Sequence, residues 1–372
     1  MIIGCPKETK DHEYRVGLTP ESAAELIKRG HGVLIEKDAG RGIGASDAAY
    51  RAVGAEIIGT AAEIFARADM IIKVKELQAE ERPLLRAGQI FFAYLHLAPD
   101  PEQTHALMQS GAVCIAYETV TGPDGGLPLL KPMSQVAGRL AVQVGATALE
   151  KSHGGSGILL GGVPGVSPAK VVIIGGGVVG FNAAQMAVGM HADVFILDRD
   201  PAALERLENH FEAKAQVLYS TGALLERLVL DADVVIGAVL IPGAATPRLV
   251  TREMIRGMRE GSVVVDVAID QGGCFETSRP TTHTNPTYVV DGVVHYCVAN
   301  MPGGVARTST YALNNATLPH ALRIADKGWR AAMQDDPHLA NGLNVWNGKI
   351  THAAVARDLN LAYTPASVAL QG

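Results

Sequence analysis

Short apolar runs alternate with amphipathic stretches along most of the chain. In the first third, residues 1–6, 69–76 and 89–96 are rich in β-branched and aromatic side chains, and stretches with helical spacing such as residues 101–111 separate such runs. A second series of apolar runs follows at residues 170–175, 193–198, 215–220, 233–239, 262–268 and 294–300. Strands that alternate with helices are typical of crossover connections and a parallel sheet. The pattern therefore predicts two doubly wound α/β domains.

The segments around the second series predict how the two domains are joined. A turn-rich stretch, residues 121–132, precedes residues 133–154, whose apolar spacing predicts a long connecting helix with Ser134 as a possible N-cap. After Asn300 the pattern becomes helical and then polar, without a further series of strands. We infer that the chain returns to pack on a discontinuous first domain. The expected domains are residues 1–128 with 307–372, and residues 129–306.

Composition narrows the class of protein. The chain has 372 residues and a net charge of -6, and its charges of both signs are mixed, so we expect no nucleic-acid partner. Its four cysteines lie far apart without a CxxC pair, which favours buried, reduced thiols over disulfides or a metal site. No uncharged apolar run reaches the ~18 residues of a membrane span. We therefore expect a cytoplasmic protein without a metal, a signal peptide or a membrane segment.

A glycine-rich motif follows the first strand of the second series. Gly175, Gly177 and Gly180 form GxGxxG between a predicted strand and a predicted helix. This motif permits a tight turn and lets the backbone approach a pyrophosphate, although such a sequence can also be only a turn. Asp198 ends the next predicted strand, where a carboxylate can bind the adenosine ribose and repel a 2′-phosphate. Asp198 could instead be a helix N-cap before Pro201. If it binds the ribose, the second domain is a Rossmann-like domain that binds NAD.

Ionisable residues stand beyond the predicted strands of the first domain. Lys75, His96 and Glu118 follow three apolar runs, and Arg15 lies in the loop after the first strand. Ligands of open parallel sheets bind beyond the carboxyl ends of the strands. An arginine can bind a carboxylate with two hydrogen bonds, a lysine adds a point charge, and a histidine exchanges protons near neutral pH. The alternatives are solvated loop charges, above all for Glu118, and a core histidine for His96.

Two polar residues take corresponding places in the second domain. Asp270 and Asn300 stand just beyond their predicted strands, so we expect both at the nicotinamide end of the site. Asp266 lies within a strand, which favours a structural role.

Several segments together resemble the NAD-dependent alanine dehydrogenases of bacteria. The matching segments are PKETKDHEYRVGLTP, IIKVKE, YLHLA, GGVPGV, VVIIGGGVVG, VVIGAVLIPGA, VDVAIDQGGCFETSRPTTH and CVANMPGGVARTSTYALNNAT, in this order. The resemblance covers nearly the whole chain, so it is far more specific than any single motif. It implies NAD as cofactor, L-alanine, pyruvate and ammonium as substrates, and a homohexamer.

The resemblance also implies roles for individual residues. Arg15 and Lys75 are expected to bind the substrate, together with Asn300, while His96 and Asp270 are the expected acid-base groups. The expected cofactor contacts are Ser134, Gly175, Gly177, Gly180, Asp198, Ser220, Val239, Leu240, Ile269, Asp270 and Asn300. The rival interpretations are a nucleotide-binding module of the transhydrogenase type, which passes hydride to a protein partner, and a catalytically silent NAD-binding homologue.

Overall fold

The chain forms two compact α/β units. The computed structural model describes residues 1–239 and 246–371, so Leu240 lies outside the described residues. Unit 1 comprises residues 1–133 and 303–372, and unit 2 comprises residues 134–302. The expected fold class is confirmed, including the discontinuous first domain, because the end of the chain completes the first sheet. None of the helices in the described parts of the chain is long and apolar enough to span a bilayer.

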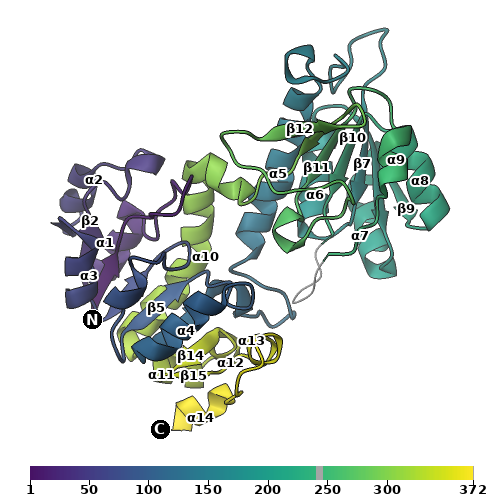
Figure 1. The fold of residues 1–372 in the computed structure, drawn as a ribbon. Helices are drawn as coiled ribbons and strands as arrows, with labels where there is room; N and C mark the ends of the chain where they lie inside the picture. Colours follow the sequence, from purple (N-terminus) through teal and green to yellow (C-terminus); the bar gives the residue numbers. More distant parts are fainter. Residues whose placement is uncertain (240–245, 372) are drawn as a thin grey trace. The chain divides into compact units, whose positions relative to one another are not determined.

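Unit 1 is built on an eight-stranded sheet (Figure 1). The strands lie in the order β15-β14-β6-β5-β4-β1-β2-β3. Their bounds are β1 (Ile2–Cys5), β2 (Gly32–Glu36), β3 (Glu56–Ile58), β4 (Met70–Ile72), β5 (Ile90–Ala93), β6 (Val113–Ala116), β14 (Leu343–Trp346) and β15 (Lys349–Ile350). The helices are α1 (Pro20–Lys28), α2 (Asp47–Ala52), α3 (Ala61–Arg67), α4 (Pro101–Ser110), α10 (Ala306–Lys327), α11 (Trp329–Gln334), α12 (Pro337–Ala340), α13 (Ala353–Asp358) and α14 (Ala366–Gln371).

The last two strands of this sheet correct the expectation that no strand follows Asn300. β14 runs antiparallel to β6 and forms a hairpin with β15. The turn between them is Asn347-Gly348, whose φ angles are 46° and 78°. Asn-Gly between two apolar runs is the strongest local signal for a tight hairpin, so the sequence did carry the information.

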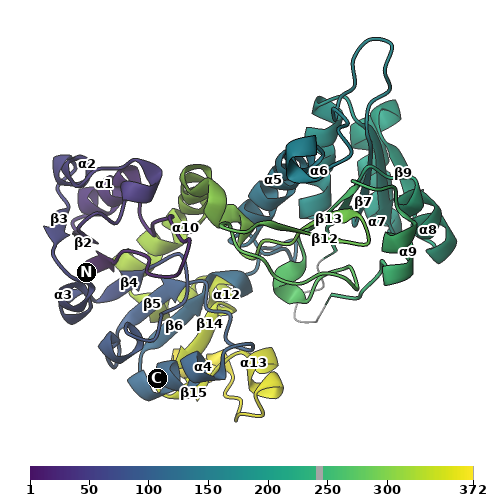
Figure 2. The same ribbon diagram turned by 45° about the horizontal axis from the view of Figure 1, so that its top comes forward.

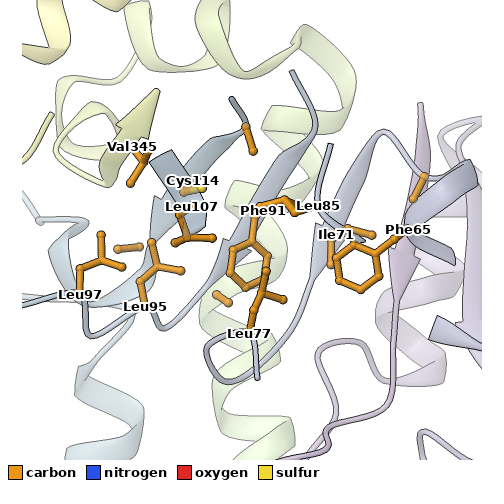
Figure 3. Packing of buried hydrophobic residues seen from close by; sticks show 14 of the residues in the cluster. Phe65, Ile71, Leu77, Leu85, Phe91, Leu95, Leu97, Leu107, Cys114 and Val345 are labelled. Carbon is orange, nitrogen blue, oxygen red and sulfur yellow. The ribbon is translucent and has the colours of Figure 1, made fainter. Parts of the chain in front are cut away.

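A buried cluster fills one face of the unit 1 sheet. Figure 3 shows Phe91 and Cys114 on neighbouring strands, packed among side chains of helices such as Phe65 of α3 and Leu107 of α4. Val345 of β14 belongs to the same cluster, so the end of the chain contributes to the core of the first unit. β5 and β6 are buried at every position, as is typical of parallel strands inside an α/β sheet.

Unit 2 is built on a seven-stranded sheet (Figure 2). The order is β12-β13-β11-β10-β7-β8-β9, in which only β12 is antiparallel. The strands are β7 (Lys170–Ile174), β8 (Asp193–Asp198), β9 (Gln216–Tyr219), β10 (Val234–Gly237), β11 (Val263–Asp266), β12 (Thr287–Val290) and β13 (Val293–Tyr296). The helices are α6 (Val178–Gly189), α7 (Pro201–Phe211), α8 (Gly222–Leu230) and α9 (Arg252–Gly257), while α5 (Lys131–Ala148) crosses the boundary between the units.

Two details of unit 2 differ from the sequence prediction. The six expected strands are joined by β12, which pairs with β13 across an Asp291-Gly292 turn with positive φ angles, again a hairpin signal. Ser134 does not cap the connecting helix, because α5 already begins at Lys131 and Pro132 occupies its first turn. Proline suits that position, since its missing N–H would have no partner within the helix.

Truncation of Phe91 tests the packing of unit 1. Phe91 is fully buried on β5, so Phe91→Ala should lower the free energy of unfolding by about 3–5 kcal/mol. Chemical denaturation of the purified protein measures this change. Val368→Ala serves as the control, because Val368 is 45% exposed and such surface changes cost no more than about 0.5 kcal/mol. Equal effects of the two substitutions would contradict the proposed core.

Candidate active site

Four ionisable residues follow four neighbouring strands of unit 1. The strands β6, β5, β4 and β1 lie side by side in the sheet and run parallel. Glu118, His96, Lys75 and Arg15 each follow one of them, in that order. Because parallel strands bring their carboxyl ends to one edge, the sheet gathers all four residues there.

His96 is not a core residue. Its neighbours Leu95 and Leu97 are buried in the cluster of Figure 3, whereas His96 itself is exposed. Its φ angle is 50°, a left-handed conformation that non-glycine residues rarely adopt. Its ring stacks on that of Tyr94, with the centroids 5.9 Å apart. The core alternative is therefore wrong, and the strained backbone points to a functional position.

The carboxylate of Glu118 binds the backbone that carries His96. It accepts hydrogen bonds from the N–H of His96 at 2.7 Å and from the N–H of Leu95 at 3.1 and 3.2 Å. Glu118 is thus not a solvated loop charge. The sequence pattern predicted that Glu118 follows a strand at the carboxyl edge of the sheet, but it did not indicate that Glu118 binds the backbone of residues 95 and 96.

Arg15 is held by a buried carboxylate. It is 2% exposed, and Glu13 accepts hydrogen bonds from its Nε at 2.6 Å and from its Nη2 at 2.5 Å. Burial by itself would lower the pKa of Arg15, but the hydrogen bonds and charge of Glu13 raise it above its usual value. The guanidinium therefore stays charged and fixed in direction. Its Nη1 lies 3.0 Å from the sulfur of Met133.

Lys75 stands three residues beyond β4, and its backbone is also tied to a carboxylate. Glu8 accepts hydrogen bonds from the N–H of Val74 at 2.6 Å and from the N–H of Lys75 at 3.4 Å. The Nζ of Lys75 lies 3.9 Å from Glu76. Burial would raise the pKa of Glu76, but Lys75 and Lys10 lower it to about 2, so this carboxylate stays charged.

A buried ion cluster beneath Lys75 was not foreseen. The Nζ of Lys73 lies 2.5 Å from Glu81 and 3.5 Å from Glu8, and its side chain is fully buried. Burial raises the pKa of Glu8 to about 7, although the charge of Lys73 opposes this shift. Lys73 and Lys75 are spaced as i and i+2, which in an extended chain places both side chains on the same face, so the sequence pattern gave no signal that Lys73 enters a buried ion cluster.

Unit 2 gathers its candidate residues in the same way. The parallel strands β13, β11, β10, β7, β8 and β9 lie side by side. The residues that end or follow them are, in this order, Asn300, Asp270, Val239, Gly175, Asp198 and Ser220. Ile269 is the buried residue before Asp270, and Ser134 lies in the first turns of α5. The carboxyl edge of this sheet therefore carries six residues of the expected cofactor set.

The three glycines of the fingerprint meet different surroundings. Gly175 has a φ of 102°, and a Cβ at Gly180 would lie 1.8 Å from the carbonyl oxygen of Gly175. The fold therefore requires glycine at both positions, whether or not a ligand binds. A Cβ at Gly177 would meet nothing within 4 Å. Gly177 begins α6, and no side chain of the described residues caps this helix. An open helix N-terminus of this kind fits a pyrophosphate, which agrees with a bound dinucleotide.

Asp198 connects the fingerprint with the strand beside it. One of its oxygens accepts the N–H of Gly176 at 2.6 Å, and the other accepts those of Arg199 at 2.7 Å and Asp200 at 2.9 Å. Asp200, and not Asp198, caps α7 by accepting the N–H of Ala202. The N-cap alternative for Asp198 is therefore wrong. A carboxylate has about four acceptor positions, which leaves capacity for a ribose hydroxyl.

Asp270 and Asn300 are brought together on neighbouring strand ends. The N–H of Asn300 lies 3.4 Å from each carboxylate oxygen of Asp270, and Asn300 has a φ of 57°. The turn that carries Asp270 is tied to Asp266, which accepts the N–H of Ala268 at 3.1 Å and that of Cys274 at 2.9 Å. Asp266 is fully buried, which agrees with its expected structural role.

Two doubly wound α/β units, with a glycine fingerprint at a helix N-terminus in one and ionisable residues beyond neighbouring strands in the other, are typical of dinucleotide-dependent proteins. Comparison with known families shows which family within this class the chain belongs to. The description Alanine dehydrogenase/PNT, N-terminal domain matches residues 4–137, and Alanine dehydrogenase/PNT, C-terminal domain matches residues 141–353. The chain belongs to the alanine dehydrogenase/PNT family. Its second unit accordingly has the nucleotide-binding domain of that family, whose cofactor is a nicotinamide dinucleotide.

Curated relatives and solved structures agree with this assignment. An alanine dehydrogenase of Halomonas elongata is 59% identical over 367 residues and covers 99% of each chain. One of Methanococcus maripaludis is 55% identical over 371 residues and covers 100% of each. A solved L-alanine dehydrogenase is 51% identical, covers 97% of this chain and 99% of its own, and has a TM-score of 0.94. A transhydrogenase from Sinorhizobium meliloti is 28% identical, with 95% and 100% covered and a TM-score of 0.81.

The surroundings of Gly177 generate a test of the fingerprint. Gly177→Ala adds a methyl group that the protein can accommodate, so the thermal midpoint should stay unchanged. NADH affinity should fall because the methyl group occupies the space where the pyrophosphate approaches the backbone. Fluorescence titration with NADH measures this. Gly189→Ala, which also meets nothing within 4 Å and lies at the end of α6, is the matched control. Equal NADH affinity in both variants would remove Gly177 from the site.

Proposed function

We propose that the chain is an NAD-dependent alanine dehydrogenase, which catalyses the reversible oxidative deamination of L-alanine to pyruvate and ammonium. The observation that carries the proposal is the edge of unit 1, where a buried arginine held by Glu13 shares one sheet edge with Lys75 and an exposed histidine. Relatives with 51–59% identity over the full chain are alanine dehydrogenases, which supports the same activity.

The substrate carboxylate binds to Arg15, and the oxygen of pyruvate or the amino group of alanine lies near Lys75. Arginine presents two parallel N–H groups to a carboxylate, so it fixes the direction of the substrate as well as its position. Glu13 keeps the guanidinium oriented before the substrate arrives. Asn300 is a further proposed substrate contact.

His96 and Asp270 exchange the protons of the reaction. The amino group of alanine must be neutral before hydride leaves the α-carbon, and the imine that results must take up water to give pyruvate. His96 accepts and returns these protons, because an imidazole titrates near neutral pH. Asp270 polarises the attacking water and stabilises the cationic imine. Both side chains are exposed, which leaves them accessible to a substrate.

A bound nicotinamide dinucleotide would supply the hydride acceptor, and residues of unit 2 would hold it. Asp198 binds the adenosine ribose and disfavours a 2′-phosphate, which selects NAD over NADP. The open N-terminus of α6 at Gly177 binds the pyrophosphate. Ser134, Ser220, Val239 and Ile269 supply further contacts.

The assembly and location that follow from this function are a homohexamer in the cytoplasm, without a nucleic-acid or membrane partner. Four buried free cysteines are compatible with a reducing compartment.

A direct assay tests the proposed activity. Purified protein with NAD and L-alanine should produce NADH, followed by its absorbance, and pyruvate with ammonium should consume NADH. NADP should be a poor substitute. Absence of alanine-dependent NADH formation would reject the proposal and would favour a carrier module that passes hydride to a protein partner.

Replacement of Arg15 by lysine should impair pyruvate reduction although the charge is kept. Lysine cannot form the two parallel hydrogen bonds that orient a carboxylate, so the KM for pyruvate should rise and NADH binding should survive. Steady-state kinetics measure both. Arg51→Lys is the control, because Arg51 is exposed on α2. Wild-type efficiency with pyruvate in the Arg15 variant would show that Arg15 does not bind the substrate.

His96→Asn should keep the fold and lose turnover. Asparagine tolerates the left-handed backbone of residue 96, so the thermal midpoint and NADH affinity should stay close to those of the wild type. Loss of an acid-base group should reduce turnover by roughly 10²–10⁴-fold in both directions. The acid limb of the pH profile for alanine oxidation should also flatten. His105→Asn, an exposed position of α4, is the matched control, and near-normal turnover of folded His96→Asn would refute the role of His96.

A further inference from the structure

Glu118 has no part in the proton transfers described above, yet its carboxylate lies against the residue that performs them. We propose that Glu118 is a positioning residue, which acts on the reaction by holding the backbone of His96. The proposal rests on the proposed function, because it assumes that His96 exchanges protons with the substrate.

The contacts of Glu118 are directed at two consecutive peptide groups. One oxygen accepts the N–H of His96 at 2.7 Å and that of Leu95 at 3.1 Å, while the other lies 3.2 Å from the N–H of Leu95. Both peptide groups lie beyond the end of β5, where the ladder to the neighbouring strands has ended. Hydrogen bonds to an ionised acceptor are about twice as strong as neutral ones.

The held segment is strained. The φ angle of His96 is 50°, and a non-glycine residue in a sparsely populated region costs about 1–3 kcal/mol. Such a conformation persists only where the surroundings determine it. The carbonyl group of Leu95 accepts a hydrogen bond from Gln103 at 2.7 Å, and that of Leu97 accepts one from Thr104 at 2.9 Å.

The carbonyl groups and the N–H groups of residues 95–97 are therefore bound by different elements. Gln103 and Thr104 are fully buried on α4 and bind carbonyl oxygens, whereas Glu118 follows β6 and binds N–H groups. Without Glu118 the carbonyl contacts would remain, but the N–H groups of residues 95 and 96 would lose their hydrogen bonds to its carboxylate. The peptide could then rotate towards an ordinary φ angle, and the imidazole would move with it. A displacement of about 1 Å can reduce turnover by roughly 100-fold.

His352 is a titratable neighbour of Glu118 that a test must consider. Burial lowers the pKa of His352, and the charge of Glu118 opposes this shift, so the two side chains lie close in unit 1. A purely structural role for Glu118 could act through that neighbour. The experiment must therefore separate an effect on His96 from an effect on the fold.

The first test removes the negative charge that strengthens both hydrogen bonds and replaces the second carboxylate oxygen, 3.2 Å from the N–H of Leu95, by an amide donor. Glu118→Gln should reduce kcat by roughly 10–100-fold while the NADH dissociation constant stays unchanged. Glu102→Gln is the matched control, because its side chain is 92% exposed on α4 and it removes the same charge without touching residues 95 and 96. A folded Glu118→Gln protein with the kcat of the wild type would overturn the proposal.

A second variant covers the case in which Glu118→Gln does not fold. Glu118→Asp keeps the charge but shortens the side chain by one methylene, so it should restore part of kcat relative to the amide and still fall below the wild type. Wild-type kcat in folded Glu118→Asp would show that the position of the carboxylate does not matter, and would also overturn the proposal.

A double-mutant cycle shows whether Glu118 acts through His96. Residues that work through one group have non-additive effects. In a His96→Asn background, Glu118→Gln should therefore leave the residual turnover unchanged. A further fall as large as that in the wild type would mean that Glu118 acts independently of His96, and the proposal would fail.

The outcomes distinguish this proposal from the proposed function. If the wild type forms no NADH from alanine, the function itself is wrong. If the wild type is active, His96→Asn is inactive and Glu118→Gln retains full kcat, only the positioning role is wrong.

Discussion

Carboxylates that accept backbone N–H groups beyond the ends of parallel strands determine where the site residues lie. A peptide group just past a strand has left the ladder, and it needs another partner if it is to stay in place. Glu8 provides one for Lys75, and Glu118 provides one for His96. In unit 2, Asp198 holds the fingerprint turn, and Asp266 holds the turn that carries Asp270. The same solution therefore recurs in both units.

This arrangement has an energetic cost that the rest of the structure offsets. Removing a carboxylate from water raises its pKa, as at Glu8, where it reaches about 7, and at Asp266. A carboxyl group whose pKa is raised in the folded state binds a proton more tightly there, so the fold loses stability as the pH rises from the group's ordinary pKa to the raised one. Near Glu8 the buried ammonium group of Lys73 opposes the shift, and around Asp266 the hydroxyl of Ser278 and nearby N–H groups do so. The held residues themselves, His96 and Asp270, remain exposed for chemistry.

The alternation of apolar runs was sufficient to predict the parallel strands that carry the candidate site residues, because buried parallel strands are apolar on both faces. The two hairpins were missed although Asp291-Gly292 and Asn347-Gly348 are strong turn signals, since the surrounding strands are short and one follows a long helical segment. The carboxylate contacts could not be predicted. Glu8 lies 66 residues from its partner Val74, and Glu118 lies 23 residues from Leu95. Which N–H a side chain reaches depends on the three-dimensional packing, which local patterns do not contain.

These carboxylates fix the site residues before any substrate binds. Amide hydrogen exchange, resolved to single residues in the protein without ligand, tests this most directly. The amides of Val74, Leu95 and His96 lie outside the strands, so exchange at unstructured rates would be their default. If Glu8 and Glu118 hold them, these amides should exchange much more slowly than unstructured peptide amides, because exchange requires the hydrogen bond to open first. Exchange at the rate of an unstructured chain at these positions would contradict the account.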